Sequence, residues 1–177
     1  MNITAGKYKG QKITAPDEKI TRPTLSKVRM SVFNTLQAMI NFEDKSFLDM
    51  FSGSGIMGLE AISRGFKSAV LIEKNKKVHS IIKSNLKKYE SENDIKLLLG
   101  DSLNICQKLC GKRSFDIIYI DPPYFSGIYE KSLETALKIS SGIIILEHII
   151  PLDLTNYNII KQKQYGDKYI TFISTID

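Results

Sequence analysis

Hydrophobic positions from about residue 41 onward fall into short apolar runs that alternate with segments of helical spacing. Five runs have the length of buried strands: Ser46 to Met50, Ala69 to Ile72, Ile95 to Leu99, Phe115 to Ile120 and Ile143 to Leu146. Four segments between them repeat apolar residues at helical spacing: Ile56 to Arg64, Lys76 to Tyr89, Leu103 to Leu109 and Tyr129 to Ile139. Such alternation predicts an α/β fold with a mostly parallel sheet and helices on both faces.

The two ends of the chain follow other patterns. Residues 2 to 14 alternate only weakly and contain Gly6 and Gly10, which predicts a hairpin or an irregular arm. A helix capped by Thr24 is then expected to run to about Ile40. Two alternating runs, Tyr157 to Lys163 and Lys168 to Ser174, flank a turn and predict a closing antiparallel hairpin. Together these patterns predict a seven-stranded sheet with a C-terminal antiparallel hairpin and a short N-terminal extension.

Length and composition favour one globular domain. The 177 residues are enough for a full core, and 42% hydrophobic and 25% charged residues are ordinary for a soluble protein. We expect a single domain over residues 1–177, with a basic arm and helix over 1–40 and the catalytic core over 41–177. No apolar run is long enough to cross a membrane, and the two cysteines favour a reducing compartment. These features predict a cytoplasmic protein, which we expect to be a monomer.

Positive charge is concentrated near the start of the chain. The net charge is +6, and residues 1–40 hold seven Lys and Arg against only Asp17 and Glu18. Such a segment is a candidate footprint for a polyanion, although a solvated lysine-rich surface explains the charge alone equally well. The candidate residues for contacts with RNA or another polyanion are Lys7, Lys9, Lys12, Arg22, Lys27 and Arg29.

The sequence Asp121-Pro122-Pro123-Tyr124 directly follows a buried strand. Two prolines fix two φ angles and remove two N–H donors, so they hold the Asp121 carboxylate in a rigid setting and leave carbonyls without local donors. A carboxylate, a free carbonyl and an aromatic ring together can bind a flat group that carries an NH2. We expect Asp121 and the Pro122 carbonyl to bind the amine and Tyr124 to stack on the base. A helix cap at Asp121 and core packing of Tyr124 are the structural alternatives.

A glycine-rich turn follows the first strand. Asp49, Phe51, Gly53 and Gly55 lie in or beside the turn, and Glu73 ends the next strand 20 residues after Gly53. Glycines allow a close backbone approach to a ligand, and an acid at this spacing can bind ribose hydroxyls. The turn GSGIMG also satisfies the dinucleotide fingerprint, so a nicotinamide cofactor stays possible.

Three features favour S-adenosylmethionine over a nicotinamide dinucleotide. Asp49 is placed to reach a cationic amino group, and Asp101, followed by Ser102, is placed after the third strand to accept from an adenine amine. The chain is also too short for the second catalytic domain of many dehydrogenases. Asp101 has an alternative role as a helix cap.

The order of these motifs resembles a known family. DxFxGSGxxG, LIE, GDS and DPPY together resemble class I S-adenosylmethionine-dependent methyltransferases that act on exocyclic nitrogens. The N-terminal pattern of Gly6 to Gly10, Arg22-Pro23-Thr24 and Val28-Arg29 resembles the bacterial 16S ribosomal RNA (guanine-N2)-methyltransferases. Because DPPY also occurs in adenine-N6 and protein glutamine methyltransferases, the N-terminal pattern carries the assignment of the substrate.

The resemblance implies methyl transfer from S-adenosylmethionine to the N2 amine of a guanine in small-subunit ribosomal RNA, within a ribosomal particle. It implies a Rossmann-like class I methyltransferase fold and no metal. In agreement, Cys106 and Cys110 lack a second ligand pair, and His79 and His148 stand alone. The alternatives are an adenine-N6 or protein glutamine methyltransferase, a nicotinamide-dependent oxidoreductase, or an RNA-binding scaffold without catalytic activity.

Overall fold

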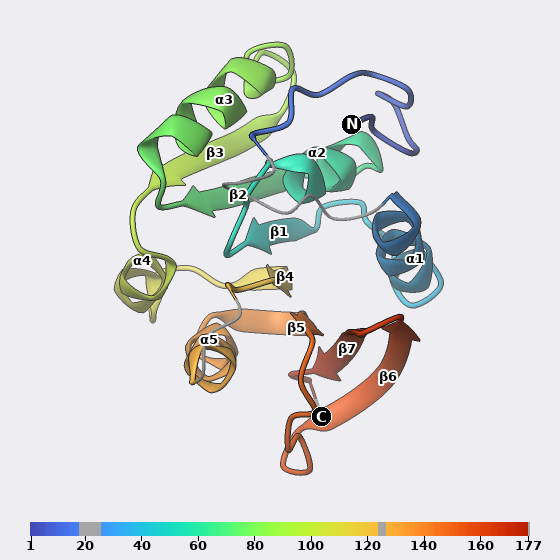
Figure 1. Cartoon of the computed structure of the whole chain (residues 1–177), viewed down its shortest axis with the longest axis vertical. Coiled ribbons are helices and arrows are strands. Elements are labelled where there is room, and N and C mark those ends of the chain that lie inside the picture. Colours follow the sequence, from blue (N-terminus) through green and yellow to red (C-terminus); the bar gives the residue numbers. More distant parts are fainter. Residues whose placement is uncertain (18–25, 124–126, 177) are drawn as a thin grey trace.

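The computed structural model describes residues 1–17, 26–123 and 127–176. One seven-stranded sheet runs through it, in the order β3-β2-β1-β4-β5-β7-β6 (Figure 1). The strands are β1 Ser46–Asp49, β2 Ser68–Glu73, β3 Asp94–Leu99, β4 Phe115–Ile120, β5 Ser140–His148, β6 Asn158–Tyr165 and β7 Lys168–Ser174. The first five are parallel, and β7 pairs antiparallel with both β5 and β6. The predicted sheet and its closing hairpin are confirmed.

Among the described residues, five helices cover the two faces of the sheet: α1 Ser26–Gln37, α2 Ile56–Ser63, α3 Lys76–Leu86, α4 Ser102–Leu109 and α5 Ile128–Leu137. Buried side chains of α1, α2 and α3 form one core cluster with one set of strand residues. Those of α4 and α5 form a second cluster with the alternate set. Because successive strand side chains point to opposite faces, each parallel strand contributes to both cores.

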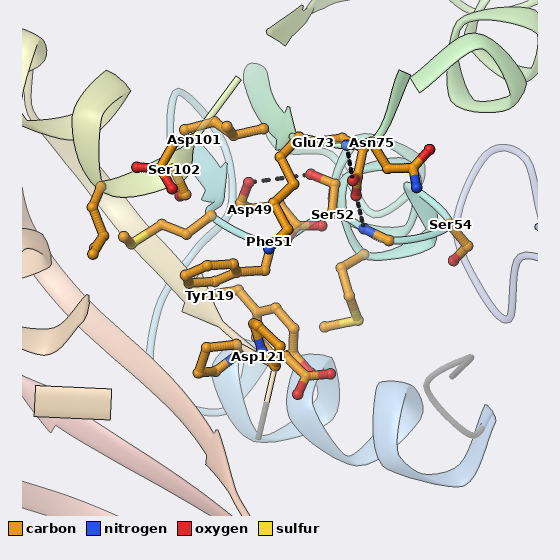
Figure 2. Close-up of a pocket in the computed structure, with 18 of the residues that line it drawn as sticks. Asp49, Phe51, Ser52, Ser54, Glu73, Asn75, Asp101, Ser102, Tyr119 and Asp121 are labelled. Atoms are coloured by element: carbon orange, nitrogen blue, oxygen red, sulfur yellow. Dashed lines mark hydrogen bonds between the residues drawn. The ribbon is translucent and has the colours of Figure 1, made fainter. Parts of the chain in front are cut away.

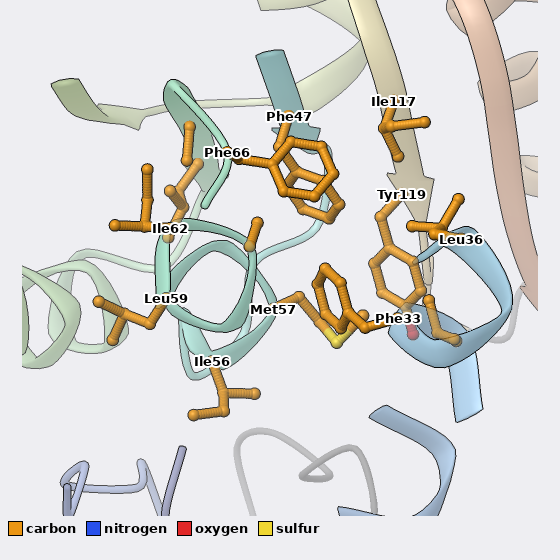
Figure 3. Packing of buried hydrophobic residues seen from close by; sticks show 14 of the residues in the cluster. Phe33, Leu36, Phe47, Ile56, Met57, Leu59, Ile62, Phe66, Ile117 and Tyr119 are labelled. Atoms are coloured by element: carbon orange, nitrogen blue, oxygen red, sulfur yellow. The ribbon is translucent and has the colours of Figure 1, made fainter. Parts of the chain in front are cut away.

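The first cluster fixes α1 against the centre of the sheet. Figure 3 shows Phe33 and Leu36 of α1 facing Phe47 of β1, Met57 of α2 and Tyr119 of β4. The Phe33 and Phe47 rings lie 5.8 Å apart, centroid to centroid. The N-terminal helix is therefore part of the core, next to β4, the strand that directly precedes Asp121. The proposed cap at Thr24 lies outside the described residues.

Residues 1–14 form an irregular arm, as predicted. A single bridge joins Asn2 to Lys12, and the arm is attached to α2 through hydrogen bonds. The Thr4 amide donates to Oε1 of Glu60 at 2.7 Å, and the Lys7 amide donates to the Ser63 carbonyl at 2.7 Å. The arm therefore belongs to the fold.

The strand register places the functional residues along one edge. Asp49 is level with Tyr119 of β4 and with Leu71 of β2, so Asp121 and Glu73 both lie two residues further on. In parallel sheets, ligands bind outside the carboxyl ends of the strands, where the strand order reverses. Here that point lies between β1 and β4.

Candidate functional site

A cavity of about 430 Å³ opens at the carboxyl edge, in the size range of small-molecule sites (Figure 2). Its wall is formed by the turn after β1, the ends of β2 and β4, and the first turns of α2, α4 and α5. It is lined by Asp49, Met50, Phe51, Ser52, Gly53, Ser54, Ile56, Met57, Ile72, Glu73, Lys74, Asn75, Gly100, Asp101, Ser102, Leu103, Tyr119, Asp121, Pro122, Pro123 and Ile128. All described residues that we predicted for cofactor and amine binding are among them except Gly55, which caps α2 directly behind the turn.

The turn after β1 depends on glycine. Gly53 has a φ of 52° and Gly55 a φ of 77°, in the left-handed region that side chains disfavour. Gly55 caps α2 without a side-chain hydrogen bond, which leaves the first N–H groups of this helix without a side-chain acceptor. The turn thus presents backbone donors beside the cavity.

Glu73 is held rigidly at the end of β2. Its Oε1 accepts from the Asn75 amide at 2.7 Å, and its Oε2 accepts from the Gly53 amide at 3.1 Å. The side chain is only 9% exposed, so the alternative of an exposed strand-end acid is wrong. Each carboxylate oxygen keeps further acceptor capacity, which suits a ligand with two neighbouring hydroxyl groups.

Asp49 is a buried carboxylate without a hydrogen-bond partner in the described part of the chain. It is 1% exposed, and neither Oδ1 nor Oδ2 accepts a hydrogen bond there. Burial raises the pKa of Asp49 to about 7, an effect that the nearby Phe51 amide and Ser52 hydroxyl offset only in part. A buried acid of this kind is costly unless a ligand supplies a donor or a positive charge.

Asp101 and Ser102 line the same cavity at the start of α4. Asp101 caps α4, because its Oδ1 accepts from the Asn104 amide at 3.0 Å, as the structural alternative anticipated. The cap uses one of the two carboxylate oxygens, so a ligand contact through the other stays a prediction. Ser102 is buried, and its hydroxyl has no partner among residues 1–17, 26–123 and 127–176.

Asp121 lies directly after β4, and its half-buried side chain lines the cavity together with Pro122 and Pro123. It is not the cap of α5, since that helix begins at Ile128 and is capped by Gly127. Figure 2 shows the Asp121 carboxylate pointing away from Glu73 and Asp101, toward the side where α1 lies. Tyr124, our predicted stacking residue, lies outside the described residues.

A buried polar network next to Asp121 was not anticipated from the sequence. The Tyr119 hydroxyl donates to Oε2 of Glu147 at 2.6 Å, and Oε1 of Glu147 pairs with the Lys168 ammonium. Glu147 is fully buried, and burial together with the carboxylates of Glu147, Asp121 and Asp49 raises the pKa of Tyr119 well above its ordinary value. Tyr119 is therefore a neutral hydrogen-bond donor, fixed two residues before Asp121 at the carboxyl edge of the sheet.

Arg29 does not have the position that the sequence suggested. It is 1% exposed, and its guanidinium donates to Oε1 of Glu60 at 3.4 Å and to the Asn2 carbonyl at 2.9 Å. The prediction that Arg29 contacts RNA is wrong, because an RNA phosphate cannot reach it. Arg29, which we expected on a charged surface, instead links the arm and α1 to α2.

The lysines of the arm lie far from the cavity. The Lys7 ammonium pairs with Glu92 at 2.7 Å, just before β3 begins, and this end of the strand is the amino edge of the sheet. The six residues of β2 separate the two edges by about 20 Å. Lys9 and Lys12 are exposed on the same arm, and Arg22 lies outside the described residues. RNA contacts by Lys7, Lys9 and Lys12 stay a prediction.

No described helix is long and apolar enough to cross a membrane. Within the described ranges, no group of three or more His, Cys, Asp or Glu side chains is placed to hold a metal ion.

The fold is that of Rossmann-like class I methyltransferases. A solved structure described as putative methyltransferase yhhF from Escherichia coli superimposes with a TM-score of 0.82 and 24% identity, over 98% of this chain and 97% of that one. The family model described as Conserved hypothetical protein 95 matches residues 1–174. The chain belongs to this family.

Two curated relatives carry more specific names. Ribosomal RNA small subunit methyltransferase D of Buchnera aphidicola is 35% identical over 131 residues, which cover 74% of this chain and 66% of that protein. Putative rRNA methyltransferase YlbH of Bacillus subtilis is 31% identical over 157 residues, which cover 84% of this chain and 82% of that protein. The match thus spans slightly less than two thirds of the Buchnera protein.

Proposed function

We propose that this protein transfers a methyl group from S-adenosylmethionine to the exocyclic N2 amine of a guanine in small-subunit ribosomal RNA. The observation that carries the proposal is the unpartnered buried carboxylate of Asp49, in a cavity that also contains Glu73 and Asp121. Relatives named as ribosomal RNA methyltransferases support the substrate class. The N-terminal sequence pattern, and not those names, supports guanine N2. The cytoplasm and a monomeric state stay predictions.

The cavity has a partner for each part of S-adenosylmethionine. Asp49 lacks a donor and suits the cationic amino group, and the Glu73 carboxylate suits the two ribose hydroxyls. Asp101 and the unpartnered Ser102 hydroxyl suit the polar edge of adenine, and Phe51 together with Leu103 and other apolar side chains of the wall suits its faces. A nicotinamide cofactor explains Glu73 equally well and does not explain an orphaned acid at Asp49.

S-adenosylmethionine, when bound, supplies a sulfonium methyl group that is already a strong electrophile. The protein therefore has mainly to position the amine. Asp121 and the Pro122 carbonyl accept the two amine hydrogens, which aims the nitrogen lone pair at the methyl group. As the nitrogen–methyl bond forms and the sulfur–methyl bond breaks, the nitrogen gains positive charge, which the Asp121 carboxylate offsets. The nitrogen then releases one proton, to Asp121 or to water, which gives the neutral methylated amine.

The strand register sets the distance between Asp121 and Glu73. Asp121 and Glu73 lie two strand spacings apart at the same level of the sheet, or about 10 Å. This distance separates the acid that binds the amine from the acid that binds the ribose. Each can therefore be substituted without direct damage to the other contact.

The decisive experiment identifies the methylated nucleoside. Labelled S-adenosylmethionine is incubated with the protein and with small-subunit particles from cells that lack it, and the RNA is digested to nucleosides. N2-methylguanosine is the expected product. N6-methyladenosine, or label only in protein, would replace the proposed acceptor with one of the alternatives. Calorimetric binding of NAD without binding of S-adenosylmethionine would overturn the proposal.

A further inference from the structure

Helix α1 and the edge strand β6 form a seam rich in lysine and hydroxyl groups. The Lys163 ammonium of β6 donates to Oγ1 of Thr35 at 2.7 Å and to Oγ of Ser31 at 3.2 Å, both on α1. The Ser31 hydroxyl also hydrogen-bonds the Tyr165 hydroxyl. Lys27 of α1 and Lys161 of β6 are exposed on the same two elements.

The two elements of the seam carry lysines and no carboxylate, since neither α1 nor β6 contains an acidic residue. Within the described residues, Lys27, Lys161 and Lys163 form no ion pair with a carboxylate, whereas Lys168 on the neighbouring strand pairs with Glu147. A half-buried ammonium with only hydroxyl partners loses hydration without gaining an opposite charge. An anionic ligand would supply that charge.

The strand register places the seam on the same sheet face as the amine-binding edge. Ile120 pairs with Leu146, Glu147 with Ile170, and Ile170 with Lys163, so Asp121 and Lys163 lie in one row across four strands. Three strand spacings separate them by about 14 Å. The two side chains share a face, because Tyr119 and Ile170 belong to the core cluster beneath α1 and Lys163 contacts α1 itself.

We propose that Lys27, Ser31, Lys161, Lys163 and Tyr165, here called the α1–β6 surface, bind backbone phosphates of the RNA that flank the target nucleotide. The proposal rests on the proposed function, because it needs a base held at Asp121. In this arrangement the RNA strand leaves the cavity on the α1 side and continues toward β6. The arm is less suited to this task, since Lys7 is already paired with Glu92 at the opposite edge.

The test compares two triple variants with the same change in charge. Lys27→Gln, Lys161→Gln and Lys163→Gln are combined in one variant, and Lys83→Gln, Lys87→Gln and Lys88→Gln, all exposed on or just after α3, in the control. The probe is unmodified small-subunit ribosomal RNA transcribed in vitro. Its dissociation constant is measured between about 50 and 200 mM salt, where counterion release dominates.

In the triple α1–β6 variant, the slope of log K against log salt should be about 2 smaller in magnitude than in the wild type, at about 0.7 per lost phosphate contact. Its affinity at about 0.1 M salt should fall on the order of 100-fold. The control should stay close to the wild type. Both should bind S-adenosylmethionine as the wild type does. The double variant Lys27→Gln and Lys161→Gln keeps the Lys163 hydrogen bonds, and should lose about 1.4 of the slope even if the triple variant folds poorly.

An unchanged slope in the double and triple variants, or an equal loss in the control, would refute the binding of RNA phosphates by the α1–β6 surface. If the wild type methylates the RNA while the variants keep its slope, only the surface is refuted. If the wild type binds the RNA with the predicted slope change in the variants but transfers no methyl group to it or to the small-subunit particles, only the proposed function is refuted. A wild type without affinity for the RNA and for the particles contradicts both.

Discussion

Replacement of Asp49 by asparagine should abolish the pH dependence of cofactor affinity that this carboxylate creates. The side chain is 1% exposed and has no hydrogen-bond partner in the described part of the chain, and its pKa rises from 3.8 to about 7. That shift corresponds to a cost on the order of 4 kcal/mol for ionising the buried acid. In the absence of a ligand, Asp49 is therefore substantially protonated at neutral pH.

The sign of the effect on stability follows from the direction of the shift. The folded state binds the Asp49 proton more tightly than the unfolded state does. Protonation of Asp49 therefore adds to the free energy of unfolding; this stabilisation is fully present below pH about 4 and is lost as the pH rises through about 7. Above that range Asp49→Asn should unfold with a larger free energy than the wild type, by up to a few kcal/mol. Urea denaturation of both proteins at acidic and mildly alkaline pH measures this difference.

Cofactor affinity should rise with pH, whereas the stability of the wild-type protein falls over the same range. If a ligand ammonium pairs with the ionised carboxylate, affinity rises about tenfold per pH unit below pH 7 and then levels off. At pH about 5.5, wild-type affinity should be about 30-fold below its plateau. Asp49→Asn should lose about 1.5–3 kcal/mol at the plateau, the usual value of a charge-assisted hydrogen bond.

Calorimetry of S-adenosylmethionine binding, across this pH range and in buffers of different ionisation heat, tests both statements. The amino group of the cofactor also titrates near pH 8, and Asp49→Asn serves as the control that reports this effect alone. Equal affinities and equal pH profiles for the two proteins would refute the pairing of Asp49 with the ligand ammonium.

Three further predictions follow from the remaining contacts. Glu73→Ala should weaken S-adenosylmethionine binding by about 1.5–3 kcal/mol, and unchanged affinity in calorimetry would exclude a ribose contact. Asp121→Ala should reduce single-turnover methyl transfer by about 10²–10³-fold with cofactor affinity preserved, and a near wild-type rate would contradict its role at the amine. Arg29→Glu should destabilise the fold by at least about 3–5 kcal/mol, because it places a second acid beside buried Glu60. Urea unfolding measures this loss, and a change below about 1 kcal/mol would contradict a buried pair.

The sheet could be predicted because its strands are buried on both faces and the helices between them are amphipathic. A strand such as β4 reads as a continuous apolar run, and Asp121 directly after it marks the carboxyl edge. Asp49 and Glu73 follow the same rule, which is why three acids far apart in the sequence could be assigned to one site. The role of Asp101 was left open, and the structure shows that it caps α4.

Arg29 was misread because only one stripe of its helix was considered. Residues 28, 29, 32, 33 and 36 are all buried, so the buried stripe of α1 is wide enough to include an arginine. The sequence does carry a signal for its partner, since Glu60 is the sole charged residue in the mostly apolar helix Ile56–Ser63. Only the fold brings these two residues together, because they lie on different helices.

Buried acids in apolar segments separate into two classes once their partners are known. Glu60 accepts from Arg29, Arg64 and Thr4, and Glu147 pairs with Lys168 and accepts from Tyr119. Both acids are neutralised within the chain and hold parts of the fold together. Asp49 has the same burial without such a partner among the described residues. Within the folded chain Asp49 avoids that cost by holding a proton, and we propose that a ligand cation pairs with it once it ionises. The sequence cannot show this difference between the acids, because it does not show their partners.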